Sequence, residues 1–427
     1  MITIPIRAVV GAQWGDEGKG KIVDLLAQQA DYVIRYQGGA NAGHTVVNEY
    51  GKFALHLVPC GIFNRETVNI IGTGTVIDLD ELVKELDMLA SRGISTERLY
   101  ISNRAHLSVP SYAQLERMAE ESRGERKQGS TLRGISPAYA AKALRLGIQM
   151  GELKDWGRLE PKLRELLAAC DDLLVKLYDA KPLAADRELI VERYAAYAKR
   201  LAPYIGDTLS LVSLAVRQDK DILLEGQLGT MRDLDWGIYP YVTSSNPLPG
   251  GACAGAGIPP QRITSVLGVV KAFSTCVGAG PFPTEQDNET GRYLREVGHE
   301  YGATTGRPRR IGWLDAVALR YAAALNGFTE LAVTKLDTLD GLPTLKVCVG
   351  YKLDGRHIDY MPLTADLYRV EPIYEEMPGW QQPTSSVQSF AALPEAAQDY
   401  VRLIEGYLNA PARLISVGPE REAAFRR

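Results

Sequence analysis

The seven-residue segment Gly-Asp-Glu-Gly-Lys-Gly-Lys, from Gly15 to Lys21, constrains this chain more than any other feature. The mostly apolar run 6–10 before it predicts a buried strand, and the run 22–27 after it predicts a helix. A glycine-rich turn between a strand and a helix N-terminus presents free backbone N–H groups and the positive end of the helix dipole to an anion. Together with its two lysines, the segment predicts a phosphate site.

The segment approaches the common phosphate loop of nucleoside triphosphatases but departs from it in two ways. The spacing G-x-x-x-x-G-K is present, yet Ile22 stands where Ser or Thr would bind Mg²⁺. Asp16 and Glu17 also place carboxylates inside the cradle, where they repel phosphate unless a cation such as Mg²⁺ bridges the charges. The alternative is an ordinary strand-to-helix turn with solvated side chains. A dinucleotide-binding fingerprint is disfavoured, because the Gly-x-Gly pairs of the chain lack the third glycine.

Short apolar strands followed by polar or glycine-rich turns recur at 32–36, 221–225 and 331–334. Such strands, with helices between them, are typical of a mostly parallel sheet covered on both faces. We therefore expect an α/β fold with a large, mostly parallel central sheet and helices on both faces. Helical leucine spacing amid many charges predicts a helical insertion at about 150–220. Ligands in such folds lie beyond the carboxyl ends of the strands, where the polar turns fall.

Composition excludes several classes of partner. With 427 residues, 45% of them hydrophobic, the chain can bury a large core. Its net charge of −4 gives no general attraction to nucleic acid or to an anionic membrane. The five cysteines are scattered without a C-x-x-C pair, which favours reduced thiols in the cytoplasm over disulfides or a zinc site. The sequence shows no signal segment and no apolar run near the roughly 20 residues of a membrane span, so we expect a cytoplasmic protein.

Two polar turns carry residues suited to nucleotide chemistry. His44, in the turn 41–45, is able to donate to a developing oxyanion or to act as a general acid. The alternative is a hydrogen-bonded turn histidine, and the nearby phosphate segment favours function. The segment Thr334–Asp337 resembles the guanine reader of GTP-binding proteins, because a buried carboxylate accepts from two guanine N–H groups that adenine lacks. A strand-end salt bridge is the alternative there.

Three more groups are candidates for binding anions or sugars. The run 303–310 gathers three arginines and two threonines, and forked guanidinium groups match carboxylates and phosphates. A solvated basic turn is the alternative. The hydroxyl-rich run 239–246 is suited to a phosphate, a sugar or a turn network. Lys142 and Arg145, on a predicted helix, are either surface charges or a phosphate clamp.

Taken together, these residues resemble the adenylosuccinate synthetase family from end to end of the chain. The resemblance is carried by the segments 13–21, 37–44, 242–246, 277–285, 304–310 and 334–337. It implies a GTP- and Mg²⁺-dependent ligase that joins L-aspartate to IMP through 6-phosphoryl-IMP and releases GDP and phosphate. It also implies a single domain, residues 1–427, with a nucleotide site like that of P-loop GTPases, and a homodimer with one Mg²⁺ per subunit.

The resemblance further assigns roles to individual residues. Asp16 would take the proton from N1 of IMP, His44 would stabilise phosphate charge and act as an acid, and Mg²⁺ would be held by Asp16 and the backbone oxygen of Gly43. Arg145 would reach the IMP site of the partner subunit. The GTP set is Gly15, Asp16, Glu17, Gly18, Lys19, Gly20, Lys21, Gly43, His44, Thr45, Arg309, Lys335, Leu336, Asp337, Ser416, Val417 and Gly418. The IMP set is Asp16, Lys19, Asn41, Ala42, Gly43, His44, Thr131, Arg145, Leu228, Thr243 and Arg307. The aspartate set is Ala303, Thr304, Thr305, Gly306, Arg307 and Arg309.

Two positions depart from the family pattern. The family usually reads Glu-Gly-Ala-Gln-Gly-Thr at 225–230, so Leu228 stands where a glutamine contacts IMP, and Gln227 is displaced by one residue. A one-residue shift in an extended segment turns a side chain the other way, so either the backbone differs here or the contact is absent. Leu132 replaces a glycine. These changes motivate an alternative, a paralogue that uses dGMP or another 2-aminopurine nucleotide. A second alternative is a GTP-binding switch without catalysis.

Overall fold

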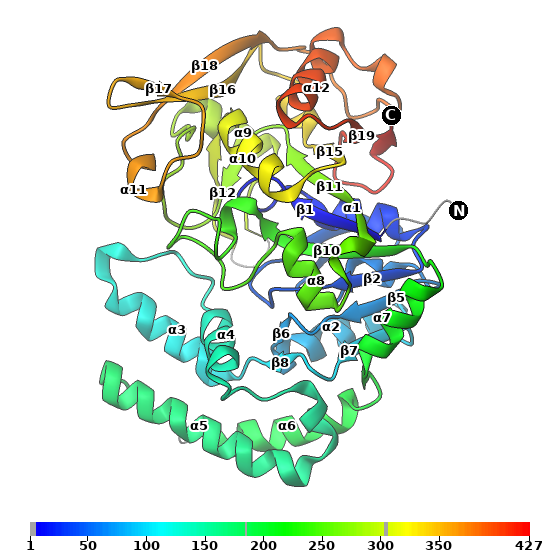
Figure 1. The fold of residues 1–427 in the computed structure, drawn as a ribbon, viewed down its shortest axis with the longest axis vertical. Helices are drawn as coiled ribbons and strands as arrows, with labels where there is room; N and C mark the ends of the chain where they lie inside the picture. The colour runs from blue at the N-terminus through cyan, green and yellow to red at the C-terminus, as the bar shows by residue number, and fades with distance from the viewer. Residues whose placement is uncertain (1–5, 184–185, 303–305) are drawn as a thin grey trace.

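The computed structural model describes residues 6–183, 186–302 and 306–427. Within these residues, ten strands form one central sheet, in which all neighbouring strands run parallel except for an antiparallel pair at one edge (Figure 1). In order across the sheet they are β20 (Ala424–Arg426), β19 (Ala412–Ser416), β15 (Glu330–Thr334), β11 (Ile263–Lys271), β1 (Ile6–Gly11), β10 (Ile222–Gly229), β2 (Tyr32–Arg35), β5 (Val68–Ile71), β7 (Leu99–Ser102) and β9 (Ile205–Gly206).

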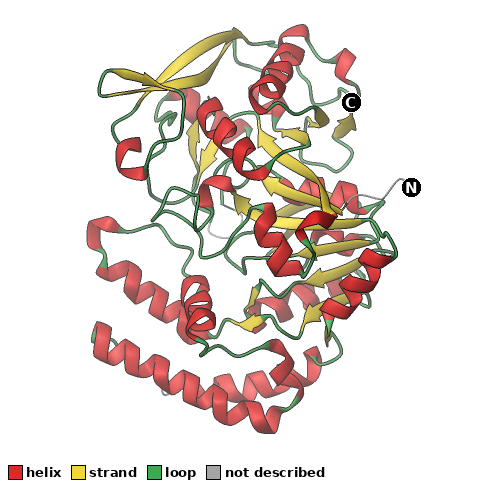
Figure 2. Ribbon diagram, viewed as in Figure 1, coloured by secondary structure: helices red, strands yellow, loops and turns green. Residues whose placement is uncertain are grey.

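Helices cover both faces of this sheet (Figure 2). The first face is covered by α7 (Thr208–Arg217), α8 (Pro249–Ala256), α10 (Ala316–Asn326) and α12 (Glu395–Leu408). The second face is covered by α1 (Lys19–Ala27), α2 (Leu79–Ser91), α4 (Ile135–Leu144), α5 (Trp156–Tyr178) and α6 (Arg187–Leu201). The remaining helices of the described chain are α3 (Pro110–Ser122), α9 (Glu289–Val297) and α11 (Thr364–Leu367). This arrangement confirms the expected fold class.

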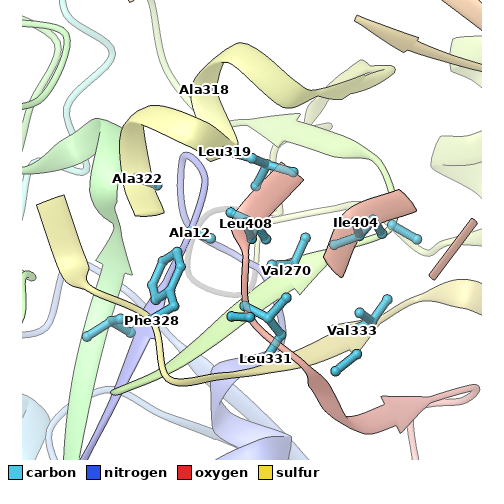
Figure 3. Packing of buried hydrophobic residues seen from close by; sticks show 14 of the residues in the cluster. Ala12, Val270, Ala318, Leu319, Ala322, Phe328, Leu331, Val333, Ile404 and Leu408 are labelled. Atoms are coloured by element: carbon cyan, nitrogen blue, oxygen red, sulfur yellow. The ribbon is translucent and has the colours of Figure 1, made fainter. Parts of the chain in front are cut away.

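The central strands are buried on both sides, which explains their nearly continuous apolar sequences. In β1, Ala8 and Val10 belong to one hydrophobic core and Val9 belongs to the other. Side chains alternate across a strand, so each central strand serves two cores. Figure 3 shows one of these cores, where Leu319 of α10 and Leu408 of α12 lie close to the strand residues of β11 and β15.

The segment at about 150–220 is mostly helical, as the leucine spacing predicts. It contains α5, α6 and α7, and α5 and α6 lie together at one end of the molecule, away from β16 (Figure 1). The segment also contributes β9, which pairs in parallel with β7 at the sheet edge. The helical segment is thus joined to the central sheet through a strand of its own. That the whole chain is one domain stays a prediction.

Smaller sheets lie around the central one. One of them carries the long antiparallel pair at the end of the molecule opposite α5 (Figure 1). These sheets consist of β3 (His44–Asn48) with β4 (Gly51–Leu55); β6 (Val76–Ile77) with β8 (His106–Leu107); β12 (Ser274–Cys276) with β13 (Arg310–Gly312); and β14 (Leu314–Asp315), β16 (Thr344–Leu353), β17 (Arg356–Ile358) and β18 (Glu371–Pro378).

The parallel sheet brings the predicted functional turns to one edge. Five neighbouring strands of the sheet, in the order β15, β11, β1, β10 and β2, all run in the same direction. Their carboxyl ends therefore meet, although these strands end at points in the sequence as far apart as Gly11 and Thr334. Among the described residues no helix combines the length and the apolar character needed to cross a membrane.

Candidate active site

The glycine-rich segment connects β1 to α1, as its sequence predicts. Gly18 precedes the first turn of α1 with φ 91°, and Gly15 has φ 102°, conformations that favour glycine. Asp16 is also left-handed, with φ 59°, which is less costly for Asp than for most residues. Gly20 allows α1 to approach His44, because a Cβ at Gly20 would lie 2.8 Å from the His44 Cβ.

Glu17 occupies the inside of this segment with its own carboxylate. Its Oε1 accepts from the backbone N–H groups of Gln13 at 3.1 Å and Gly15 at 2.9 Å, and Lys19 Nζ lies 2.5 Å from its Oε2. Glu17 and Lys19 are both buried. Backbone N–H groups and an ammonium group, the donors expected to meet phosphate, are therefore already organised around an internal anion.

Lys21 turns away from the glycine segment toward the C-terminal segment of the chain. Its Nζ donates to Ser416 Oγ at 2.8 Å, to Gly418 O at 2.6 Å and to Ala423 O at 2.8 Å. Burial lowers the pKa of Lys21 to about 8. Although Lys21 fits the spacing of a phosphate-loop lysine, in this structure its ammonium group connects α1 to the segment after β19.

His44 is buried at the start of β3, rather than in an open turn as the sequence suggested. Its Nδ1 lies 2.5 Å from Glu225 Oε1, and its Nε2 is buried without a hydrogen-bond partner. Burial lowers the pKa of His44, and the Glu225 carboxylate opposes that effect. Because the Glu225 carboxylate accepts a hydrogen bond, Nδ1 carries a proton and donates it to Glu225. Nε2 is therefore the ring nitrogen that is able to exchange a proton with a substrate.

Glu225, which sequence reasoning did not select, supports His44 from the middle of β10. Its Oε2 accepts from the Cys60 backbone N–H at 2.8 Å, and Arg35 Nη1 lies 3.9 Å from its Oε1. Burial alone would raise the pKa of Glu225, but the bonds to His44 and the charge of Arg35 hold it below its ordinary value. The signal in the sequence was a charged residue ending an otherwise apolar strand, and its partner could not be read from it.

Asp16 belongs to a second group of charges. Arg309 Nε lies 3.0 Å from Asp16 Oδ2, and Arg309 Nη1 lies 2.5 Å from Glu300 Oε2. Glu300 is fully buried and also receives Lys271 Nζ at 2.9 Å. Burial would raise the pKa of Glu300, but Lys271 and Arg309 lower it to about 2. Arg309 is thereby held against Asp16 by a buried carboxylate, Glu300, that the sequence did not single out.

A pocket of about 400 Å³ opens beside these groups. Its walls include residues that the family resemblance assigns to IMP and Mg²⁺, namely Asp16, Asn41, Ala42, Gly43, Thr131, Leu228 and Thr243. The pocket does not include Arg145 or Arg307, both of which are exposed. Arg145 ends α4 with φ 64°. The predicted aspartate-binding residues Ala303, Thr304 and Thr305 lie outside the described residues. Gly306, which follows them, is exposed and has φ 65°.

Leu228 reaches the pocket through a local change of backbone. The pairing of β1 with β10 shifts register between Val9 and Gly11, which face Glu225 and Gly229. Three residues of β10 therefore stand opposite one residue of β1, and Leu228 in this bulge has φ 64°. The backbone here departs from a regular strand, and Leu228 lines the pocket with an apolar side chain. Leu132 is left-handed too, with φ 58°.

The predicted guanine residues lie directly after β15, and at the end of β19 and just beyond it. Lys335 has φ 62° and donates to Gly298 O at 2.7 Å. Asp337 Oδ1 is buried without a hydrogen-bond partner, and burial raises the pKa of this carboxyl group. The residues Leu336, Ser416 and Val417 are buried, and Gly418 is partly exposed. An unpaired carboxylate oxygen here is suited to accept N–H donors from a base.

Comparison with known proteins identifies the family. A family model described as adenylosuccinate synthetase matches residues 8–425. An adenylosuccinate synthetase of Frankia alni is 49% identical over 420 residues, with 98% of each chain covered. The fully ligated adenylosuccinate synthetase of Plasmodium falciparum is 39% identical with a TM-score of 0.94, covering 99% of this chain and 100% of that one.

A cyanophage S-2L succinoaminodeoxyadenylate synthetase bound to dGMP and dATP is a more distant match. It is 20% identical with a TM-score of 0.62, covering 99% of this chain and 95% of that one. At this identity the likeness shows the fold alone. The matches to adenylosuccinate synthetases over nearly the whole chain make the dGMP-using paralogue and the non-catalytic switch the less favoured alternatives. The chain belongs to the adenylosuccinate synthetase family, and it is a GTP-dependent ligase that joins L-aspartate to IMP in purine biosynthesis.

Proposed function

We propose that Asp16 is the general base of the ligation. It would accept the proton from N1 of IMP, so that the 6-oxygen becomes nucleophilic and attacks the γ-phosphate of GTP. The amine of L-aspartate then displaces the 6-phosphate and gives adenylosuccinate. The observation that carries this proposal is the position of Asp16, which belongs to the glycine segment between β1 and α1 and also lies on the pocket wall. No other residue of that segment has a carboxylate facing the pocket.

We assign to His44 the stabilisation of phosphate charge and the role of acid. Glu225 holds its Nδ1, which leaves Nε2 to face an incoming group. Burial keeps the imidazole neutral before an anion arrives, since it lowers the His44 pKa. An approaching phosphate raises that pKa again, because an opposite charge nearby favours the charged form. Proton uptake at Nε2 would then accompany nucleotide binding.

The residues present fit Mg²⁺. Asp16 and Gly43 both line the pocket, and a carboxylate and a backbone carbonyl are the hard oxygen donors that Mg²⁺ prefers. When bound, the ion would neutralise charge on the transferring phosphate. Asp16 also has an arginine, Arg309, 3.0 Å away, which shows that its carboxylate already accommodates a cation. We propose one Mg²⁺ per subunit.

We also propose which residues bind GTP and aspartate. Asp337, with its unpaired buried oxygen, would accept the guanine N–H groups, and Lys335 would lie beside the base. Lys19 and the backbone N–H groups around it would meet the phosphates. Arg309 lies beside Asp16, where its guanidinium group is suited to bind the carboxylate of aspartate or a phosphate of GTP.

We further propose a homodimer in the cytoplasm. Arg145 stands between Leu144 and Leu146, whose side chains are 65% and 62% exposed. Large exposed apolar side chains next to each other are typical of an interface. An interface there would carry Arg145 toward the pocket of the partner, as the family resemblance implies. Light scattering of the purified protein tests this, and a monomer at assay concentration would refute it.

One experiment tests the proposed reaction. The protein is mixed with IMP, L-aspartate, GTP and Mg²⁺, and formation of the substituted purine is followed by absorbance. Parallel reactions replace GTP by ATP, or IMP by dGMP. We expect turnover with IMP and GTP and little with either replacement. Appreciable turnover only with dGMP would support the paralogue, and GTP binding without any product would support the switch.

A further inference from the structure

A chain of hydrogen bonds runs from the buried core to the wall of the pocket. Arg35 Nη2 donates to Gln227 Oε1 at 2.5 Å, and Gln227 Nε2 donates to Asn41 Oδ1 at 2.6 Å. Asn41 Nδ2 then donates to Thr243 Oγ1 at 3.3 Å. Arg35 and Gln227 are fully buried, whereas Asn41 and Thr243 line the pocket. Every donor in this chain therefore points from the core toward the pocket.

The direction of the chain follows from the chemistry of its first member. A guanidinium group has donors only, so the Gln227 atom that faces Arg35 must be the carbonyl oxygen. The Gln227 amide nitrogen then faces Asn41 and requires the Asn41 carbonyl oxygen. Asn41 consequently turns its NH₂ group toward Thr243. Because Thr243 Oγ1 accepts from Asn41, its own proton is left for a group in the pocket.

The surroundings of Gln227 are shaped to hold its amide in place. Gly38 has φ 85°, and a Cβ there would lie 2.3 Å from Gln227 Oε1. Gln37 Nε2 donates to the Gln227 backbone oxygen at 2.7 Å. The bulge in β10 directs Gln227 into this buried position and Leu228 to the pocket wall.

We propose that Gln227 is a positioning residue that makes Asn41 and Thr243 a pair of donors for the phosphate group of the purine nucleotide. The inference rests on the proposed function, under which this pocket binds IMP. The second N–H of the Asn41 amide and the Thr243 hydroxyl both remain to donate, and hydrogen bonds to an anionic oxygen are the strong ones. Gln227 itself touches no substrate and acts through Asn41.

Two variants of equal length at this position separate polarity from packing. In Gln227→Glu, the carboxylate accepts from Arg35 and also requires a donor from Asn41. The Asn41 amide then turns over, and the Thr243 hydroxyl turns back to donate to Asn41, so the pocket loses donors. In Gln227→Met, the volume is kept and no polarity is imposed. Calorimetry measures the affinity of each protein for IMP and for inosine, which lacks the phosphate group.

We expect Gln227→Glu to weaken IMP binding by about tenfold or more, the effect of losing one hydrogen bond to a charged group. Gln227→Met should lose less, and both variants should bind inosine as the wild type does. Equal losses in the two variants, or unchanged IMP affinity in Gln227→Glu, would overturn the inference. If Gln227→Glu does not fold, a loss confined to IMP in Gln227→Met supports the inference, and a loss shared with inosine overturns it.

The binding readout keeps this test separate from that of the proposed function. A wild-type protein that binds IMP more tightly than inosine but forms no product would overturn the proposed reaction. In that case the role of Gln227 is supported if Gln227→Glu removes the difference in affinity, and overturned if the difference persists. A wild-type protein that binds IMP no better than inosine would overturn the role of Gln227, whatever its turnover.

Discussion

The pair Glu225–His44 offers the sharpest test of the catalytic proposal. In the variant Glu225→Gln, the side chain keeps its length but offers one acceptor oxygen in place of two. His44 Nδ1 and the Cys60 backbone N–H each use one oxygen of Glu225, so one of these donors loses its partner. The negative charge beside the imidazole is lost as well.

The structure sets the expected magnitude. With charge centres about 4 Å apart and an effective dielectric constant of about 20, a carboxylate stabilises an imidazolium by about 4 kcal/mol. At about 1.4 kcal/mol per pKa unit this is about three units, and the neighbouring Arg35 reduces the effect. The imidazolium fraction at neutral pH would therefore fall by about a hundredfold to a thousandfold. If His44 acts as an acid, kcat falls by the same factor.

The assay is the pH profile of kcat with IMP, aspartate and GTP saturating. Because the substitution lowers the His44 pKa, acidification restores the protonated form, so activity of Glu225→Gln should rise toward low pH relative to the wild type. Cys60→Ser is the matched control, since it changes the thiol that lies 3.2 Å from Glu225 Oε1 but keeps the carboxylate and the backbone bond. It should retain most of the activity.

Two results would refute this reasoning. The first is a Glu225→Gln variant with the kcat and pH profile of the wild type. The second is a loss in which Cys60→Ser matches Glu225→Gln, because the cluster would then serve packing alone. Thermal unfolding followed by circular dichroism confirms that each variant is folded.

Three other substitutions have definite outcomes. Asp16→Ala should abolish turnover and leave a folded protein by circular dichroism; turnover like that of the wild type would disprove its role as base. Lys21→Met should raise the KM for GTP about tenfold and leave that for IMP unchanged, because one hydrogen-bonded charge anchoring the C-terminal segment is lost. Since the pKa of Lys21 is about 8, the wild-type KM for GTP should also rise above pH 8, and a flat KM would contradict this. Glu300→Gln should lower the free energy of unfolding in urea by about 3 kcal/mol, because it leaves the buried Lys271 without its carboxylate and removes one of the two carboxylates that pair with Arg309. With a pKa lowered from 4.5 to about 2, Glu300 stabilises the wild type fully above pH 4.5 and loses that contribution as pH falls through about 2, so the difference between the two proteins should shrink with acid.

Much of the fold was accessible from local sequence. The glycine segment specifies a strand, a tight turn and a helix start through residues that are adjacent in the chain, and the structure places α1 there. Apolar runs without alternation predicted strands buried on both faces, as in β1. His44 was harder to place, because its neighbours do not reveal that a hairpin, β3 with β4, buries it.

The sequence by itself determined which chemical groups the chain has and where strands and helices form, because those depend on neighbours a few residues apart. Tertiary structure alone decided which groups meet. Glu225 lies 181 residues from His44 and Gln227 lies 186 residues from Asn41, and parallel strands with a bulge bring each pair into contact. A shift of one residue in that strand would exchange the buried amide of Gln227 for the side chain of Leu228, so register, which local sequence does not encode, sets the hydrogen bonds of the site.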